Sequence, residues 1–182
     1  MGTSTKLNGT LRRFIEAQQM FFVATADTTG RVNVSSKGMD TLRLLSDTRL
    51  LWLNLSGSGN ETAAHVRATG RMTLMFCAFE GDALILRTYG TARVAHPRDA
   101  DWADLAGHFT LLPGSRQIFD LTIDLVQTSC GSGVPFMDFK GPRGEAEMLP
   151  FYDEMGPEGL RDYWARKNTR TIDDTPTHIF ED

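Results

Sequence analysis

The stretch Trp52–Phe76, which reads WLNLSGSGNETAAHVRATGRMTLMF, changes character several times along its length. Residues 49–55 form an apolar run that favours a strand, and a loop of small residues follows it. Residues 61–68 are compatible with a helix that Gly70 would end, and residues 71–79 form a second β-like run. The stretch therefore predicts a strand, a loop, a helix and a strand in succession.

The loop of this stretch is Ser56-Gly57-Ser58-Gly59-Asn60. Ser58 and Glu61 have the S-x-x-E spacing of a capping box, which predicts a helix start here. A Gly/Ser loop before a helix exposes backbone N–H groups at the positive end of the helix dipole, and this arrangement suits a phosphate. Glu61 places negative charge at the same end, so an anion would need basic side chains from elsewhere. A plain capped turn is the alternative, and the spacing matches neither a dinucleotide fingerprint nor a P-loop.

Length and composition predict a single globular domain over residues 1–182. Of the 182 residues, 41% are hydrophobic and 23% are charged, as in ordinary globular proteins. The net charge of -4 and the absence of a Lys/Arg run give no electrostatic reason to expect nucleic acid as a partner.

The sequence also argues against a membrane anchor and a metal site. No apolar run is long enough to cross a bilayer, and the N-terminal MGTSTKLNGT has no apolar signal-peptide core. The two cysteines, Cys77 and Cys130, give no disulfide framework, and the four histidines show no metal-ligand spacing. We therefore expect a protein of a reducing, cytoplasmic compartment with no bound metal and no membrane partner.

Outward from the central stretch, further strands are predicted on both sides. Residues 7–19 are weakly amphipathic and predict an N-terminal helix. Residues 20–26 and 31–36 flank a turn-like DTTG sequence and predict a hairpin. Residues 83–94 predict a long strand with a bend or bulge at Gly90.

The clearest alternation lies in residues 117–126. Phe119, Leu121, Ile123 and Leu125 would share one face, and the residues between them are polar, as in a strand with one buried face. With about six or seven strands, short connections and three or four helices, the pattern favours a mainly β, antiparallel barrel with flanking helices.

The C-terminal third reads differently. Residues 129–135 (SCGSGVP) predict a loop with unusual backbone freedom. Leu160, Tyr163 and Trp164 have helical spacing and predict a last helix. The tail after Asn168 is polar, and we expect it to be poorly packed.

The order of FVATADTTGRVNVSSKG, LLWLNLSGSGNETAAHVRATGRMTLMF and ALILRTYGTARV resembles the pyridoxamine 5'-phosphate oxidase-like superfamily of FMN-binding split-barrel proteins. The resemblance covers about residues 14–137 and leaves a helical C-terminal extension. It implies a six-stranded antiparallel split barrel. It also implies a homodimer that holds FMN at the interface between its subunits.

Carried over by position, the resemblance assigns cofactor contacts to five segments. The NVSSKG strand would line the flavin, and the strand at Trp52 would pass along its ring. The following loop and helix start would contact the phosphate and ribityl chain of FMN. The segment QTSCGSGVPF would reach the flavin ring, either in its own subunit or in the partner subunit. The implied cofactor-binding residues are Ser35, Ser36, Lys37, Leu53, Asn54, Ser58, Asn60, Glu61, Thr62, Arg71, Gln127 and Ser129.

For several single residues, an ordinary structural role is the alternative to a functional one. Lys37 by itself is typical of a solvated surface residue. Cys130 could be a nucleophile, but a buried inert thiol is the favoured interpretation. His65 is expected on the surface of a helix, and Trp52 is expected in the core or an interface.

The resemblance predicts a flavin-dependent oxidoreductase that acts on an unknown small molecule, with no residue assigned as catalytic. Lys37 or Arg71 would stabilise negative charge on the flavin and its phosphate. The chain departs from pyridoxamine phosphate oxidases proper, because SSK replaces their basic phosphate strand and PTHIFED does not resemble their C-terminal segment. This departure argues against vitamin-B6 oxidation. The alternatives are a flavin-, F420- or haem-binding protein without turnover, and an interaction module without a cofactor.

Overall fold

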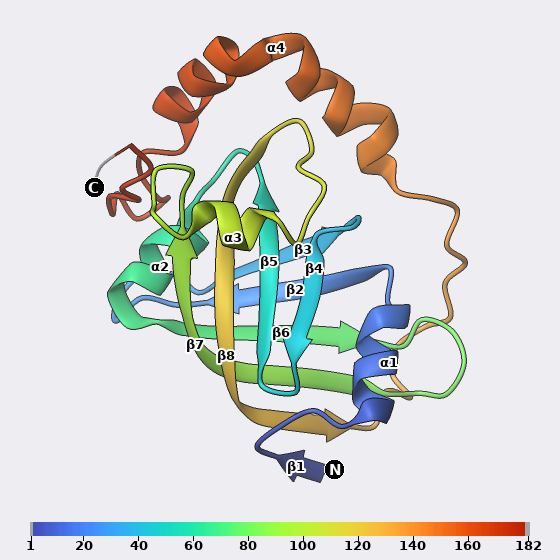
Figure 1. Ribbon diagram of the computed structural model, residues 1–182. Helices are drawn as coiled ribbons and strands as arrows, with labels where there is room; N and C mark the ends of the chain where they lie inside the picture. The colour runs from blue at the N-terminus through green and yellow to red at the C-terminus, as the bar shows by residue number, and fades with distance from the viewer. Residues whose placement is uncertain (1, 181–182) are drawn as a thin grey trace.

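The computed structural model describes residues 2–180, which contain eight strands and four helices (Figure 1). The strands are β1 (Gly2–Ser4), β2 (Met20–Thr25), β3 (Asn33–Gly38), β4 (Leu42–Ser46), β5 (Arg49–Leu55), β6 (Arg71–Cys77), β7 (Ile85–Ala95) and β8 (Ser115–Ser129). The helices are α1 (Gly9–Ala17), α2 (Glu61–Thr69), α3 (Trp102–Ala106) and α4 (Arg143–Lys167).

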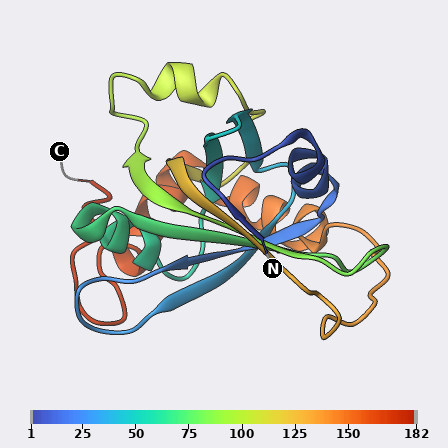
Figure 2. The same cartoon turned by 90° about the horizontal axis from the view of Figure 1, so that it is seen from below.

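One antiparallel sheet with the order β3-β2-β6-β7-β8-β5-β4 forms the body of the molecule, and β1 pairs with β8. The long strands β7 and β8 bend and take part in both crossing layers of the sheet (Figures 1 and 2). The predicted mainly β split-barrel class is thus confirmed. The described residues form eight strands where six were expected, partly because the three-residue β1 adds to one edge.

Strand β5 is buried on both faces, which explains its continuous apolar sequence. Leu50 and Trp52 face the main core, whereas Leu51 and Leu53 face a smaller cluster under α3. The Trp52 ring stacks on Phe119 with 4.8 Å between ring centroids. The expectation that Trp52 is a core residue is confirmed.

The bend predicted at Gly90 is present as a shift in the β7–β8 register after Tyr89. A Cβ atom at Gly90 would lie 1.9 Å from the Thr122 carbonyl oxygen, so only glycine fits this close approach. The same irregularity changes the side to which β8 side chains point. Ile123 is buried as predicted, but Leu125 is exposed and Val126 takes the next core position.

The predicted N-terminal helix is shorter than residues 7–19 and starts after Asn8, whose side chain accepts a hydrogen bond from the Leu11 N–H (2.9 Å). Leu11, Phe14 and Ile15 pack on the main core as their spacing predicts.

Helix α2 begins where expected, but the predicted capping box is wrong. Asn60, not Ser58, is the N-cap, and its side chain makes no capping hydrogen bond. The Glu61 carboxylate instead accepts a hydrogen bond from the Ile172 N–H (3.3 Å), because the C-terminal segment lies against this loop. Gly70 ends the helix in the left-handed conformation (φ 68°), as predicted.

Helix α4 arches over the end of the barrel (Figure 1) and is kinked at Gly156. Residues 168–177 follow it and are called the C-terminal strap here. The expectation that the tail after Asn168 is poorly packed is wrong, because Thr171 and Thr177 are buried, as is Asn168 itself. The strap folds back on itself through a hydrogen bond from the Thr177 N–H to the Thr169 carbonyl (3.0 Å). Polar side chains can be buried here because backbone groups satisfy them.

Candidate functional site

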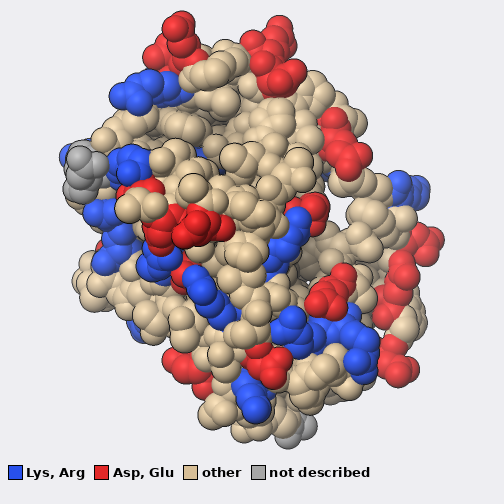
Figure 3. All heavy atoms as spheres, in the orientation of Figure 1, with Lys and Arg blue, Asp and Glu red and all other residues tan. Residues whose placement is uncertain are grey.

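A cleft of about 730 Å³ lies between the barrel and the start of α4. Figure 3 shows the surface hollowed there, under the first turns of α4. The end of β3 and the end of β5 form one wall, and Arg143, Glu145 and Met148 of α4 line the other. Its size is in the range of small-molecule sites.

A second cleft of about 570 Å³ adjoins the first and shares Lys37, Leu55 and Ser56 with it. The loop before α2, the strap and the start of β8 line this cleft. The two clefts therefore offer an elongated ligand one continuous surface, with Lys37 at the junction.

Lys37 reaches this junction from β3, where it pairs across the sheet with Phe21 of β2. Its Nζ lies 5.4 Å from the centroid of the Trp52 ring, within the range of a cation–π contact. Burial, and next the charge of Arg116, lowers the pKa of Lys37 to about 8. Lys37 is thus a half-buried cation that faces a second cation.

Arg116 is the principal site residue that the sequence did not reveal. It stands at the start of β8, is 3% exposed and lines the second cleft. Its Nη1 donates to the Gly59 carbonyl (3.1 Å) and to the Asn168 Oδ1 (2.7 Å), whereas its Nε has no partner among residues 2–180. Burial lowers its pKa to about 10, so it stays charged at neutral pH. Its position directly before the strand predicted over residues 117–126 was the sequence signal that could have identified Arg116.

A buried polar cluster lies between the two clefts and the core. Asn54 of β5 pairs across the sheet with Gln117 of β8, and the Gln117 Nε2 donates to the Asn60 Oδ1 (2.7 Å). The Asn54 Oδ1 has no hydrogen-bond partner in the described part of the chain, although the residue is 2% exposed and lines the first cleft. A buried acceptor without a partner in a cleft wall is suited to a ligand donor.

Most of the predicted cofactor residues line the two clefts. The residues in this group are Ser35, Ser36, Lys37, Leu53, Asn54, Ser58 and Glu61. Two others, Asn60 and Thr62, are buried behind the loop, where Thr62 accepts a hydrogen bond from the Asn33 side chain (3.2 Å). They hold the loop in place and do not line a cleft.

The remaining three predicted residues lie away from both clefts. Arg71 is exposed at the start of β6. Gln127 accepts a hydrogen bond from the Tyr89 hydroxyl (3.1 Å) near the far end of β8, and Ser129 accepts one from the Arg87 guanidinium (3.1 Å). A role for these residues at the same ligand would require a second subunit.

Two interpretations of single residues are wrong. His65 is buried, not on the surface, and its Nδ1 lies 3.1 Å from the Thr25 hydroxyl, because α2 packs this face against β2. Cys130 is exposed, not buried, since the glycine-rich loop after β8 extends into solvent. Its hydrogen bond with the Ser132 hydroxyl lowers the pKa of the thiol.

The surface carries no broad basic face in the view of Figure 3, where Lys and Arg side chains are interspersed with Asp and Glu. In residues 2–180, no helix is both long and apolar enough to span a membrane. Within the same range, no three His, Cys, Asp or Glu side chains come together as a metal site would require.

The chain matches known proteins in sequence and in fold. The family model described as pyridoxamine 5'-phosphate oxidase matches residues 7–130. The pyridoxamine 5'-phosphate oxidase family protein ustO of Aspergillus flavus is 33% identical over 187 residues, which is 93% of this chain and 75% of that protein.

Solved structures at lower identity share the fold. A putative pyridoxamine 5'-phosphate oxidase from Lactobacillus delbrueckii is 18% identical with a TM-score of 0.55, over 70% of this chain and 99% of its own. The protein HupZ from Group A Streptococcus is 17% identical with a TM-score of 0.53, over 72% of this chain and 99% of its own. These likenesses show the shared fold, and the family model and the Aspergillus relative show that the chain belongs to the pyridoxamine 5'-phosphate oxidase family.

Proposed function

We propose that this protein binds FMN in the two adjoining clefts and acts as a flavin-dependent oxidoreductase on a small molecule. One observation carries the proposal. Seven of the twelve residues that the sequence assigned to the cofactor come from separate segments of the chain and line these two clefts. Residues far apart in sequence therefore meet where an elongated ligand would fit.

The side chains present fit the chemical groups of FMN. Lys37 and Arg116 supply positive charge in the second cleft, and Asn54 offers an unpaired acceptor in the first. Bound flavin would supply the electron-transfer chemistry, while the protein binds and orients it. In this arrangement Lys37 lies at the junction of the two clefts, so its positive charge is next to the parts of FMN in both clefts. The buried strand β5 forms one wall of the first cleft at Leu53.

We also propose a homodimer in a reducing, cytoplasmic compartment, which the two free cysteines support. The apolar side chains of β6 do not offer a dimer face, because Met72, Leu74 and Phe76 are buried in the barrel. Val32 and Val34, beside and within the edge strand β3, are 70% and 63% exposed and are better suited to contact a second subunit. A monomer at micromolar concentration by light scattering would contradict this part of the proposal.

An absorption spectrum tests the cofactor. The purified protein is incubated with FMN, desalted and compared with the same protein incubated with F420 or with haem. Retention of perturbed flavin bands at one FMN per subunit is the expected result. A Soret band or a retained deazaflavin band would replace FMN by the other cofactor, and a spectrum without any retained cofactor would contradict the proposal.

Reduction of the bound flavin separates an enzyme from a binding protein. NADH or NADPH is added under anaerobic conditions, and bleaching of the flavin band is followed over time. Bleaching faster than that of free FMN supports the oxidoreductase. A tightly bound flavin that neither donor reduces would favour a storage or sensing protein.

A further inference from the structure

The two walls of the first cleft differ in origin. The wall formed by β3 and β5 carries four of the predicted cofactor residues, namely Ser36, Lys37, Leu53 and Asn54. The opposite wall consists of residues between 139 and 148, which belong to the C-terminal extension, and none of the predicted cofactor residues lies in it. A flavin held by the first wall would therefore leave the second wall free to contact a substrate.

Large apolar side chains line this second side of the cleft. Phe139 and Met148 come from the C-terminal extension, and Met39 comes from the turn between β3 and β4. The Phe139 side chain is 52% exposed, although it is apolar. Methionine fills irregular spaces and makes favourable contacts with aromatic rings. Arg143 and Glu145 lie on the same wall, but they carry opposite charges and are exposed, so water solvates them without a ligand.

Met39 has an unfavourable backbone conformation. Its φ of 63° lies in the left-handed region, and among residues 2–180 it is the only apolar residue other than glycine found there. Its side chain reaches across the cleft to α4, because a Cβ atom on Gly144 would lie 2.4 Å from the Met39 Sδ. Strained backbone of this kind is concentrated at functional sites. The strain therefore points to a role for the Met39 side chain in the cleft.

A side pocket of about 130 Å³ adjoins the first cleft, with which it shares Gln18, Gln19, Met39 and Asp40. Its volume is close to that of a cavity of about 150 Å³ that binds benzene. The apolar residues that line the side pocket are Ile15, Phe21, Leu42, Leu44 and Phe76.

The polar groups of the side pocket do not require a polar ligand. The Asp40 carboxylate accepts a hydrogen bond from the Arg43 Nη2 (2.7 Å), and the Gln18 Nε2 donates to the Phe14 carbonyl (2.8 Å). Glu16 also lines the pocket but is exposed, so water can solvate its charge. An apolar group is thus the ligand that gains most from entering this space.

We propose that Met39, Phe139 and Met148, together with the side pocket, bind a small aromatic ring or short alkyl group of the substrate. The proposal deepens the proposed function and rests on it for the flavin beside this site. The substrate class is then a small molecule with one apolar group of about the size of a benzene ring.

Toluene is the probe, because it carries an aromatic ring and no charge. The full chain is labelled with ¹³C at the methionine methyl groups, and their NMR signals are followed as toluene is added. We expect the signals of Met39 and Met148 to shift, because an aromatic ring would lie next to them. Met72 is the internal control, since it is 2% exposed in the main core and should not shift.

Three substitutions test the site through the affinity for toluene. Leu44→Phe fills the side pocket and should weaken toluene by about tenfold. Met148→Ala should weaken it by about threefold, and Met155→Ala, at a half-buried position of α4 outside the cleft and the side pocket, is the matched control with no effect. Circular dichroism shows whether each variant is folded, and Met148→Ala keeps the test valid if Leu44→Phe does not fold.

Met39→Gly separates the side chain from the backbone. Glycine adopts a φ of 63° without strain, so a loss of toluene binding in this variant comes from the missing side chain. We expect a loss of about threefold. Unchanged affinity would remove Met39 from the site.

The outcomes separate this site from the proposed function. If flavin is retained but toluene shifts neither methyl signal up to its solubility, the site is overturned and the flavin function stands. If toluene shifts both signals while no flavin is retained, the apolar site stands and the flavin function fails. In the FMN-loaded protein, toluene should also change the flavin absorption spectrum, because it replaces water near the ring. A shift of Met39 without such a change would show that the side pocket is not part of the substrate site.

Discussion

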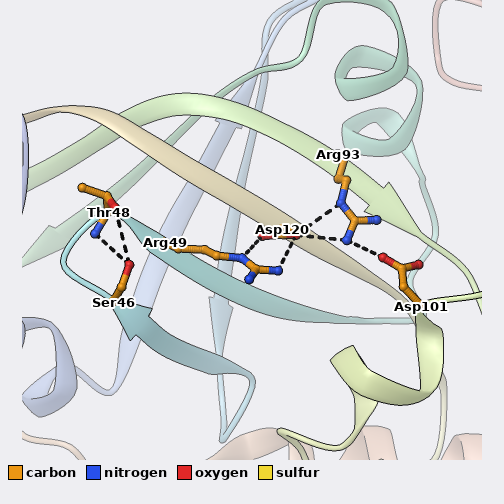
Figure 4. A network of polar contacts seen from close by, with 6 residues as sticks. All are labelled: Ser46, Thr48, Arg49, Arg93, Asp101 and Asp120. Carbon is orange, nitrogen blue, oxygen red and sulfur yellow. Dashed lines mark hydrogen bonds and ion pairs between the residues drawn. The ribbon is translucent and has the colours of Figure 1, made fainter.

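Arg116 and Asp120 lie on the same strand, β8, but the charges around them are arranged in opposite ways. At Asp120, the guanidinium of Arg49 makes two hydrogen bonds of 2.9 Å to the carboxylate, and Arg93 links Asp120 to Asp101 (Figure 4). At Arg116, no carboxylate is within ion-pair distance in the described chain.

The difference separates a structural charge from one that is available to a ligand. The cluster of Asp120, Arg49, Arg93 and Asp101 satisfies its own charges with side chains of three different strands and α3's N-terminal flank. The Arg116 cluster satisfies only one guanidinium nitrogen, through neutral oxygens, and leaves its charge facing a cleft. Fold stability should therefore depend on the first cluster, and ligand binding on the second.

The largest effect is expected at Asp120. Asp120→Ala removes the acceptor of both arginines and should lower the free energy of unfolding by about 2 kcal/mol, because the arginines left behind remain partly solvated. Urea denaturation measures the loss. Asp124→Ala, an exposed position on the same strand, should change stability by less than about 0.5 kcal/mol. Equal losses in the two variants would show that the Asp120 network adds nothing.

A substitution at Asn168 tests the difference between the unpaired Arg116 and the paired Asp120. Asn168→Asp would give Arg116 a carboxylate partner at the atom that now accepts from it at 2.7 Å. The phosphate group of FMN would then face an Arg116 whose charge is already neutralised. The affinity for FMN should therefore fall by about tenfold. Calorimetry measures this, and Asn8→Asp at the N-cap of α1 is the control for the same chemical change. An unchanged affinity would mean that the charge of Arg116 does not bind the ligand.

A smaller effect is expected in acid. Burial would raise the pKa of Asp120, but the hydrogen bonds and charges of Arg49 and Arg93 outweigh it and hold this pKa below its ordinary value. A depressed carboxyl pKa contributes stability that is complete above the unfolded pKa of about 3.9 and is lost as the pH falls through the folded pKa. Urea denaturation is measured from about pH 6 down to about pH 3, in steps of about one pH unit. The free energy of unfolding should decline more steeply for the wild type than for Asp120→Asn. Parallel declines would contradict this.

A pH-dependent effect in alkali is expected at Lys37. Its pKa is lowered to about 8 in the folded protein, whereas that of an unfolded lysine is about 10.4. The unfolded chain therefore binds more protons between these values, and stability should rise with pH across this window relative to Lys37→Met. Denaturation of both proteins at several pH values within the window measures the difference. A constant difference would show that Lys37 is solvated like an ordinary surface lysine.

The strand pattern explains why much of the barrel was predictable from the sequence. The apolar residues of β5, the glycine at position 90 and the left-handed cap at Gly70 each follow a local rule that holds in most surroundings. The two errors at His65 and Cys130 have a common cause. Whether a helix face or a loop is covered depends on segments far away in the chain, and no local pattern records it.

The candidate site shows the same division. Lys37, Asn54 and Ser58 were assigned from a resemblance along the sequence, and the two clefts bring them together. The strap was expected to be loose, because its composition is polar. Its burial depends on hydrogen bonds to Arg116 and the loop before α2, which are distant in sequence.

By itself, the sequence determined the mainly β class, the strand–loop–helix–strand unit of residues 52–76 and the family, because periodicity, turn residues and their order are local properties of the chain. The tertiary structure alone decided that Arg116 stays unpaired while Asp120 is paired, and that the strap encloses the second cleft. Charge pairing and burial depend on which distant segments meet, and the one-dimensional pattern does not contain that information.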